Sequence, residues 1–529
     1  MGDAGPPQYY ENTLVPLPIN AETLAKSFRE LRDAVYIGSE LVHANEMLPE
    51  KWSVGGMFKH FPGVALAFLR LDYQSSVLAD AGKPSPDYRG FALQRIPSGF
   101  PDCPLRPSRL SPAGSFSPIA AATLHILSKV AQANWQSDSN PSLAQEDINF
   151  LYDAANLALQ NEHLVPHDDR KMGGDEMLYG RAGLLWVLLN IRRHEFDEST
   201  QKALSPVFDT IPRLVDVIIH AGRQGAKEYI QEHGETDAHP LMYPWMEGRY
   251  CFGAAHGITG ILTIVLSSKP EELEKHLPII GSTITALCKL SNATNGHLPM
   301  ALPPMSFGQT SEFVQLCHGS PGTLILLSAA LKNGPLTRDH WCPDWDHWCP
   351  DWDQTIYLGT QRIWEEGILS KGGSLCHGIS GNAWPWLMLH GVFEYHSSDI
   401  NEARSTYTQR TGISSPLASD FSKELTPDFF LSKALAFMLH SRETRPYNTA
   451  SASADKEYRM PDDPYSLYEG LAGNICAWAE TSAVLQAKLR KMELSAKGIS
   501  YEDDRVFQQA MHSQLGFPLI GGNGAVGIL

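Results

Sequence analysis

The sequence predicts an all-α protein in which an inner ring of seven helices is enclosed by an outer ring of about seven. Seven segments combine a glycine with a following run of apolar residues, and amphipathic, charged stretches lie between these runs. A helix that is apolar all round must be buried, whereas a helix with one polar face can cover it. The apolar runs therefore predict the inner ring, and the amphipathic stretches predict the outer ring.

The seven apolar runs follow one another along the whole chain. Most begin with a GxxG step, as in YGRAGLLWVLLNI, whereas the first two keep only the closing glycine. Glycine at a helix start lets neighbouring backbones approach closely. Amphipathic stretches begin, for example, at Ala21 and Pro270. The closing glycines are Gly63, Gly114, Gly183, Gly260, Gly322, Gly381 and Gly473.

A unit repeated in this way predicts one domain over residues 1–529, although the length alone would suggest roughly three or four. The spacing of the glycines varies, which indicates one supersecondary unit with insertions of different length. We expect loop insertions near residues 335–353, 392–425 and 442–464, which are rich in polar residues or proline and have no regular period.

Composition and charge narrow the class of protein. The chain has 43% hydrophobic residues and a net charge of −17, which argues against nucleic acid and anionic membranes as partners. The uninterrupted apolar runs are far shorter than the ~20 residues that span a bilayer, so no transmembrane segment is expected. The N-terminus has an acidic residue and prolines where a signal peptide would be basic and then apolar, which favours a cytoplasmic protein.

The eight cysteines do not resemble a disulfide framework. Four of them are expected to be small buried residues of the core. Two others belong to HWCPDWD, which occurs twice in direct tandem from His340 to Asp353 and is better explained by a local duplication than by a metal cluster. The expected core cysteines are Cys103, Cys251, Cys288 and Cys476.

The remaining two cysteines lie in segments that nearly repeat each other. LCHGSPG carries Cys317 and His318, and LCHGISG carries Cys376 and His377. Each places a thiol and an imidazole directly before a glycine-rich helix start. If the helix starts meet at one end of the ring, these segments offer two sulfurs and up to two nitrogens to a single zinc ion. His256, in GAAHG, occupies the equivalent position of the preceding repeat.

These motifs resemble the LanC-like proteins, the eukaryotic relatives of bacterial lanthionine cyclases. The resemblance rests on LYGRAG from Leu178, GAAHG from Gly253, LCHG from Leu316 and LCHGISGN from Leu375. It implies the α/α toroid of the family, a barrel of seven helices inside another, with zinc at one mouth of the inner barrel. The implied zinc ligands are Cys317, Cys376 and His377, and three protein ligands leave the fourth position of a tetrahedral site open, as in catalytic zinc sites.

The resemblance also implies a reaction. In the cyclases a zinc-activated thiol adds to dehydroalanine or dehydrobutyrine, and His256 matches the general acid that protonates the resulting enolate. Glu176 matches an acidic residue that could orient this histidine, although Glu176 and Asp175 could also be ordinary acids at a helix N-terminus. His318 would face the substrate rather than ligate the metal.

Two departures bear on the substrate. Phe313 stands where the bacterial enzymes carry an arginine, which favours the eukaryotic branch, whose members resemble glutathione-binding proteins. Lys371 matches a basic residue of that branch and could pair with a glutathione carboxylate. Gln8 stands in place of a family arginine. The resemblance thus implies transfer of glutathione to dehydroamino acids in peptides or proteins.

Two other classes remain open at this stage. The chain could be a non-catalytic adaptor that binds zinc and glutathione, in which case His256 would be dispensable. It could also be a glycosidase, because α/α toroids host sugar chemistry as well. A glycosidase needs two carboxylates across one cleft, and Glu176 and Glu469 are the available residues at repeat starts.

Overall fold

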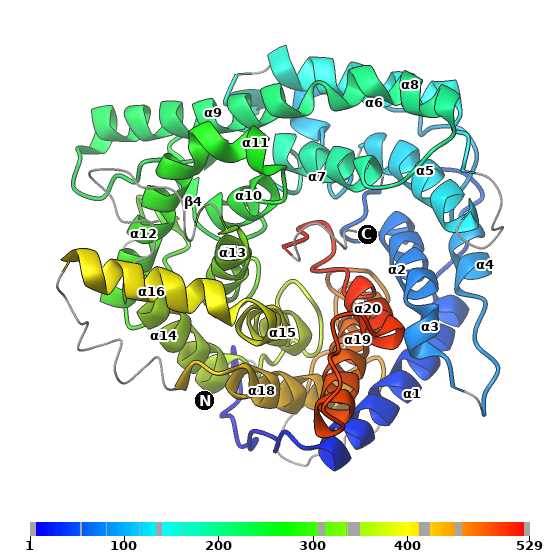
Figure 1. Ribbon diagram of the computed structural model, residues 1–529. Coiled ribbons are helices and arrows are strands. Elements are labelled where there is room, and N and C mark those ends of the chain that lie inside the picture. The colour runs from blue at the N-terminus through cyan, green and yellow to red at the C-terminus, as the bar shows by residue number, and fades with distance from the viewer. Residues whose placement is uncertain are drawn as a thin grey trace, which may run out of the picture.

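The computed structural model describes residues 7–52, 55–80, 82–115, 117–133, 140–160, 162–304, 313–334, 336, 350–411, 424–449 and 457–522. Within these ranges, seven helices form a closed inner ring in which each helix packs against the next and α19 packs against both α15 and α2 (Figure 1). The inner helices are α2 (Phe61–Tyr73), α5 (Ile119–Ala133), α7 (Arg181–Arg192), α10 (Ile258–Val265), α13 (Ser320–Lys332), α15 (Ile379–Tyr395) and α19 (Leu471–Ala496).

An outer layer of helices covers the inner ring, which confirms the predicted double ring (Figure 1). Its members are α1 (Ala21–Asn45), α4 (Tyr88–Leu93), α6 (Gln145–Gln160), α9 (Ile211–His233), α12 (Leu277–Ala293), α14 (Pro350–Glu366) and α18 (Pro427–His440). Shorter or peripheral helices are α3 (Ser75–Leu78), α8 (Glu198–Phe208), α11 (Pro270–Leu273), α16 (Ser397–Thr411), α20 (Arg505–His512) and the 3-10 turns η1 (Pro107–Arg109), η2 (Glu274–His276) and η4 (Ser441–Glu443).

The two layers differ in the way the sequence forms them. Every residue of α15 from Ile379 to Phe393 is buried, because both faces of an inner helix meet other helices. Helix α9 instead buries one apolar stripe that includes Leu214, Ile218 and Tyr229. The side chain of Asn20 caps the N-terminus of the outer helix α1. The residues that precede the inner helices α2, α7, α10, α13, α15 and α19 make no such side-chain capping bond, and all but one of them are glycine.

Six of the seven predicted glycines are the third residue of an inner helix, as Gly183 is in α7. Gly114 is the exception, because it lies in the loop before α5 rather than in its first turn. A Cβ atom at Gly114 would lie 2.5 Å from the carbonyl oxygen of Leu178. The second repeat therefore uses its glycine to let two loops pack closely, and the predicted helix start at that position is wrong.

The loops that precede the inner helices meet at one end of the ring, which we call the metal mouth. Backbone hydrogen bonds of 2.8–3.4 Å join neighbouring loops around most of this mouth. The opposite end, where the inner helices finish, is called the far mouth. The backbone hydrogen bonds at the metal mouth run, with the donor named first, from Phe58 to Ala113, Leu110 to Tyr179, Ala254 to Leu316, Cys317 to Cys376, Cys376 to Tyr468 and Tyr468 to Phe58.

A small antiparallel sheet, which the sequence did not predict, lies among these loops. Its order is β1 (Leu164–His167), β2 (Arg170–Gly173), β3 (Pro244–Met246), β4 (Arg249–Cys251) and β5 (Ala301–Leu302). The register pairs Leu164 with Gly173 and Tyr250 with Leu302. The strands have two to four residues, too few to show a period of two. The sheet connects outer helices to the starts of α7 and α10.

The expected insertions differ in structure. Helix α16 occupies Ser397–Thr411, so this part of the 392–425 stretch is helical rather than a loop. Polar side chains with few apolar partners can form a helix at the surface, and composition alone did not reveal it. Around 442–464 the described residues are irregular after η4. His340, Cys342, His347 and Cys349 lie outside the described residues, whereas the second HWCPDWD copy ends inside α14.

The C-terminal residues 513–522 fill part of the ring interior (Figure 1). Gln74, at the end of α2, donates to the carbonyl oxygen of Ser513, and Glu480 accepts from the amides of Leu515 and Gly516. Tyr468, at the metal mouth, donates to the carbonyl oxygen of Pro518 at 2.6 Å. The segment therefore enters from the far mouth and supports the loops of the metal mouth.

Two further expectations can be compared with the described residues. Cys251, Cys288 and Cys476 are buried as predicted, whereas Cys103 is partly exposed because it lies in an irregular segment before η1. Across the described ranges, no helix combines the length with the apolar character that crossing a membrane requires.

Candidate metal centre

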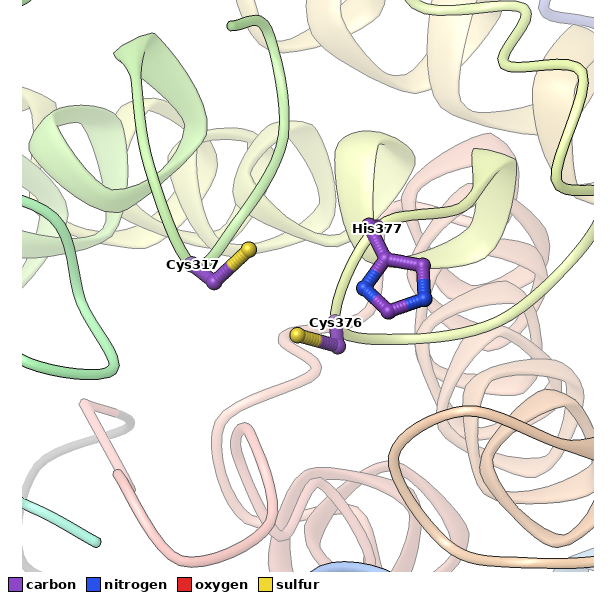
Figure 2. Close-up of side chains that lie close together, drawn as sticks. All are labelled: Cys317, Cys376 and His377. Atoms are coloured by element: carbon purple, nitrogen blue, oxygen red, sulfur yellow. The ribbon is translucent and has the colours of Figure 1, made fainter. Parts of the chain in front are cut away.

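Two thiols and an imidazole converge at the metal mouth (Figure 2). Cys317 lies just before α13, and Cys376 and His377 lie just before the neighbouring helix α15. One ligand atom from each of the three residues lies within 4.8 Å of the other two. Both cysteines are buried, and His377 is partly exposed. The structure thus brings together the three residues that the sequence assigned to the metal.

The donor set fits a divalent ion that prefers sulfur and nitrogen. Ligands at zinc distances of about 2.0–2.3 Å are separated by roughly 3.5–3.8 Å in a tetrahedral site, so small side-chain movements would complete the geometry. A hydrogen bond from Cys376, with further help from His377, lowers the pKa of Cys317 well below that of an ordinary thiol. The hydrogen bond that Cys376 makes to Cys317, together with burial and the charge of Cys317, in turn raises the pKa of Cys376. The pair thus shares one proton, which a metal ion would displace.

The loop backbones are fixed by close contacts. The amide of Cys317 donates to the carbonyl oxygen of Cys376 at 3.2 Å. Gly319 adopts a φ of 125°, and a Cβ atom there would lie 2.0 Å from the carbonyl oxygen of Phe313. A Cβ atom at Gly253 would lie 1.8 Å from the carbonyl oxygen of Cys317. Glycine is therefore required at both positions, because any side chain would push the metal-ligand loops apart.

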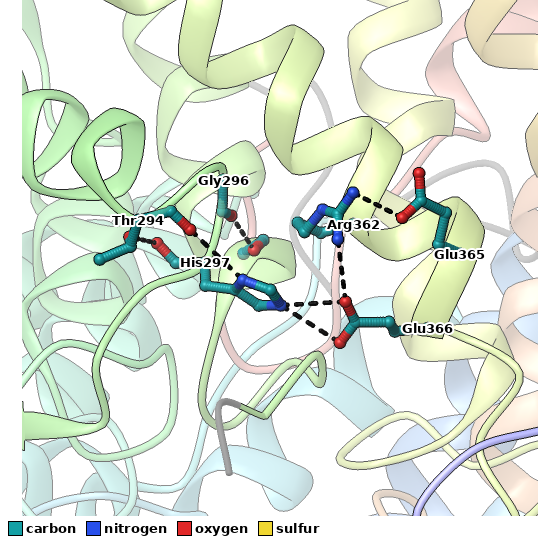
Figure 3. A network of polar contacts seen from close by, with 7 residues as sticks. Thr294, Gly296, His297, Arg362, Glu365 and Glu366 are labelled. Atoms are coloured by element: carbon teal, nitrogen blue, oxygen red, sulfur yellow. Dashed lines mark hydrogen bonds and ion pairs between the residues drawn. The ribbon is translucent and has the colours of Figure 1, made fainter. Parts of the chain in front are cut away.

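A polar network supports the start of α13 from outside (Figure 3). Ser320, the first residue of α13, donates to the carbonyl oxygen of Gly296. The ring of the adjacent His297 contacts the carboxylate of Glu366 at 3.1 Å, and Arg362 contacts the same carboxylate at 3.1 Å. The turn after α12, helix α14 and the Cys317 loop are thereby joined.

A histidine and a carboxylate form a second cluster at this mouth. Nδ1 of His256, before α10, is hydrogen-bonded to the carboxylate of Glu176, before α7. Glu176 is 1% exposed, and the Trp245 ring lies 4.8 Å from the His256 ring. Burial lowers the pKa of His256, but the charge and hydrogen bond of Glu176 outweigh it, and the pKa is raised above its ordinary value. His256 is therefore held ready to carry a proton.

The other polar residues of these loops have different surroundings. The ring of His318 lies 6.1 Å from that of His256, and burial lowers the pKa of His318. Asp175 forms a buried ion pair with Arg181 at 2.7 Å, which anchors the start of α7. Asp175 thus has a structural partner, whereas the neighbouring Glu176 points to His256.

The sequence model of the lanthionine synthetase C-like protein family matches residues 127–411, which is more than half of the chain. The matched segment contains the starts of α7, α10, α13 and α15, and with them all three thiol and imidazole ligands. The chain belongs to this family.

The chain can also be compared with individual proteins. The chain is 24% identical over 378 residues to a zebrafish (Danio rerio) protein named glutathione S-transferase LANCL1, and the alignment covers 71% of each chain. It is 24% identical over 342 residues to the LanC-like protein GCL1 of Arabidopsis thaliana, covering 64% of this chain and 63% of that protein. Among solved structures, nisin cyclase aligns with 91% of this chain and 97% of its own, with 13% identity and a TM-score of 0.34.

Phe313, Lys371 and Gln8, which bear on the expected substrate, also lie near this mouth. The N-terminal segment pairs with the strand-like segment before Lys371, since the amide of Ser370 donates to the carbonyl oxygen of Gln8 at 3.2 Å. Lys371 and Gln8 are both exposed. Phe313 is partly buried, and its ring lies 6.4 Å from that of His318. Gln8 and Lys371 are thereby brought into one region, next to the Cys376 loop.

In other repeats, polar residues also occupy the position of His256, His318 and His377, two residues before the inner helix begins. The sequence analysis missed Lys59 and Tyr179 and considered Glu469 only for a glycosidase. Lys59 and Glu469 hold this position in the first and last repeats and form an ion pair at 3.1 Å. Tyr179 holds it before α7. Reading this one position through every repeat would have found them. Cysteine and histidine chemistry alone did not point to them.

Proposed function

We propose that this chain is a zinc-dependent enzyme that adds a thiol, most simply that of glutathione, to dehydroalanine or dehydrobutyrine residues of a peptide or protein. The observation that carries the proposal is the presence of two clusters at one mouth. Cys317, Cys376 and His377 form a metal-binding set, and the Glu176–His256 pair lies on the neighbouring loops. The first set suits thiol activation, and the second suits proton transfer.

Cys317, Cys376 and His377 would hold the zinc ion. Zinc, when bound, lowers the pKa of a thiol so that thiolate is available at neutral pH. Cys317 and Cys376 would supply thiolates that balance its charge, and with only three protein ligands the site would remain open to an incoming thiol. These ligands come from rigid, mutually bonded loops, so the chain can hold the thiol sulfur in one place relative to His256.

His256 would complete the addition. The thiolate sulfur forms a bond to the β-carbon of the dehydroamino acid, and the electron pair of the carbon–carbon double bond moves to the α-carbon and its carbonyl group. A proton from His256 then saturates the α-carbon, and the net change is addition of the thiol across the double bond. Glu176 stabilises the protonated ring and fixes which nitrogen it presents.

Glutathione is the favoured thiol for two reasons. The zebrafish relative carries the name glutathione S-transferase. In this chain, the exposed Lys371 lies five residues before Cys376 and could pair with a carboxylate of the tripeptide. The exposed Gln8 has no charge to add to that contact, so we expect weaker glutathione binding than in relatives with an arginine there.

The test is to incubate the zinc-loaded protein with glutathione and a peptide that contains dehydroalanine, and to follow the adduct by mass spectrometry. We expect adduct formation well above the uncatalysed rate, and loss of the excess in Cys376→Ala. A protein that binds zinc and glutathione but does not exceed the uncatalysed rate would be an adaptor instead.

The glycosidase alternative has less support. Glu469 is paired with Lys59 at 3.1 Å, and Glu176 is bonded to His256. Each carboxylate is therefore already engaged by a basic side chain, whereas a glycosidase needs one of its two carboxyl groups placed to donate a proton to the glycosidic oxygen. The two thiols would also have no role in that chemistry.

A further inference from the structure

The far mouth of the ring contains a cavity that the thiol chemistry does not use. It has a volume of about 540 Å³ and is lined by the final residues of three consecutive inner helices, α7, α10 and α13. A helix of 13 residues such as α13 is about 20 Å long, so this cavity and the metal mouth lie at opposite ends of the same helices. A ligand here would not compete directly with one at the metal mouth.

The charge of the cavity is opposite to that of the protein. The chain has a net charge of −17, yet the lining carries Arg192, Arg193, Lys269 and Lys332. The described residues that line it do not include an aspartate or glutamate. Cations at the ends of helices complement the helix dipole, which accounts for part of this charge. The contacts of the individual side chains show which of these charges are already paired within the protein.

Arg192 and Arg193 are in different situations. Arg192 makes a two-pronged ion pair with the carboxylate of Glu272, at 2.5 and 3.0 Å, which satisfies its charge. Nη1 of Arg193 is buried and has no hydrogen-bond partner in the described structure. Burial and the charge of Arg192 lower the pKa of Arg193 to about 10. Burying a guanidinium nitrogen in this way is unfavourable unless an anion joins it.

Two more groups of the lining match a phosphate. The hydroxyl oxygen of Ser268 is buried without a hydrogen-bond partner, and the residue is 8% exposed. Lys332, at the end of α13, also lines the cavity; burial lowers its pKa to about 8 although the charge of Glu480 opposes the shift, so it is mostly charged at neutral pH. Lys269 is exposed at the rim. The cavity thus offers a guanidinium fork, two ammonium groups and a hydroxyl, a set typical of phosphate binding.

The rest of the lining is apolar, with Leu189, Leu266 and Ala329 among its residues. Ligand sites commonly combine an apolar wall with a few polar groups, and about 300–1,000 Å³ is their usual size. We propose that the far mouth binds a small organic phosphate, with its phosphate group on Arg193 and Ser268 and its organic part against the apolar wall. Three positive charges beside the Arg192–Glu272 pair favour a dianion over a singly charged ligand.

The test is calorimetric titration of the zinc-loaded protein with phenyl phosphate at low salt, with benzenesulfonate as a singly charged ligand of similar shape. We expect saturable binding of phenyl phosphate to one site, weaker binding of benzenesulfonate, and weakening of phenyl phosphate binding by added sodium chloride. Arg193→Gln should weaken binding about tenfold or more, because a hydrogen-bonded charge pair is lost.

Three further variants locate the site. Lys269→Gln changes an exposed side chain and should weaken binding by a smaller factor even if Arg193→Gln proves unstable. Arg29→Gln removes the same charge from the exposed face of α1 and should leave binding unchanged. Cys376→Ala should also leave it unchanged. The proposal is overturned if phenyl phosphate does not bind saturably, if the two far-mouth variants bind like the wild type, or if only Cys376→Ala removes binding.

Discussion

The metal mouth and the far mouth are formed by opposite ends of the same inner helices. At the metal mouth, short loops precede the helices, and the loops are joined to one another by backbone hydrogen bonds. At the far mouth, the helices end at different lengths and continue into connections that differ from repeat to repeat. The repeat therefore conserves one geometry at the helix starts, where a shared position can carry chemistry, and leaves the other end free to vary.

Histidines illustrate the difference. At the metal mouth, Glu176 raises the pKa of His256 despite burial. At the far mouth, burial and the charge of Arg193 lower the pKa of His194, two residues beyond the end of α7, to about 4. A histidine is therefore favoured in its protonated form at the metal mouth and in its neutral form at the far mouth, and the charge of the neighbouring side chain determines the difference.

The largest effect is expected from His256→Asn. This change removes the group that protonates the α-carbon but leaves the metal ligands in place. Loss of a general acid commonly lowers a rate by ~10²–10⁴, so adduct formation should fall by that factor while zinc content and glutathione binding persist. Steady-state rates measure adduct formation, metal analysis measures zinc content, and calorimetric titration measures glutathione binding. His220→Asn, on the exposed side of α9, serves as the control. Equal rates in wild type and His256→Asn would remove this histidine from the mechanism.

The second effect concerns the segment that connects the mouths. Glu480, 3% exposed, accepts hydrogen bonds from Leu515 and Gly516 and lies 3.9 Å from Arg70, which also donates to Gly516. Glu480→Ala leaves the Arg70 charge buried without this carboxylate, and breaking such a pair typically costs ~3–5 kcal/mol in the free energy of unfolding.

Urea unfolding followed by circular dichroism checks this value. Glu493→Ala changes an exposed glutamate on the same helix and should have only a small effect. A loss in Glu480→Ala no larger than in this control would mean that the C-terminal segment is not anchored as described.

Glu176→Gln should have a smaller effect on the reaction than His256→Asn. Carboxylates that orient a histidine commonly contribute about 10- to 100-fold. Because Glu176 raises the pKa of His256, its neutral replacement should lower that pKa. His256 acts in its protonated form, so activity should be lost at a lower pH in the variant as pH rises. A pH–rate profile identical in shape to that of the wild type would show that Glu176 does not act through His256.

The smallest effect is expected at the far mouth, from His194→Gln. The pKa of His194 is about 4 in the folded chain, and that of histidine in an unfolded chain is about 6.5. The unfolded state therefore binds an extra proton between these values, and this residue makes the folded state lose stability as pH falls through that window. The variant should lose less stability than the wild type between pH 6.5 and 4 in urea unfolding. A loss as steep as in the wild type, or equally reduced in His220→Gln, would contradict the assignment.

Features of the fold and the site that a local sequence motif specifies could be predicted from the sequence. The inner helices and the convergence of Cys317, Cys376 and His377 followed from a repeated motif, because equivalent positions of a ring meet at one end. The Glu176–His256 pair was expected from the resemblance, and the structure places the two side chains in contact. Strands of two to four residues carry too little pattern to be predicted.

Contacts between distant segments could not be predicted in this way. Lys59 and Glu469 meet only because the last repeat closes onto the first. Arg193 and Lys332 lie far apart in the sequence, at the ends of α7 and α13, and only the ring brings them to one cavity. Helix α16 was missed because its sequence is mostly polar, and Ile400, Ala403 and Tyr407, which pack against the core, are too few to give a clear apolar pattern.

The central claim is that the two repeated loops form one zinc centre at the metal mouth. Metal analysis of the purified protein tests it most directly, in the wild type, Cys317→Ala, Cys376→Ala and Cys288→Ala. We predict a single zinc ion per chain in the wild type and in Cys288→Ala, whose cysteine is buried in α12, and little or none in the other two variants. Full zinc content in both Cys317→Ala and Cys376→Ala would contradict the assignment.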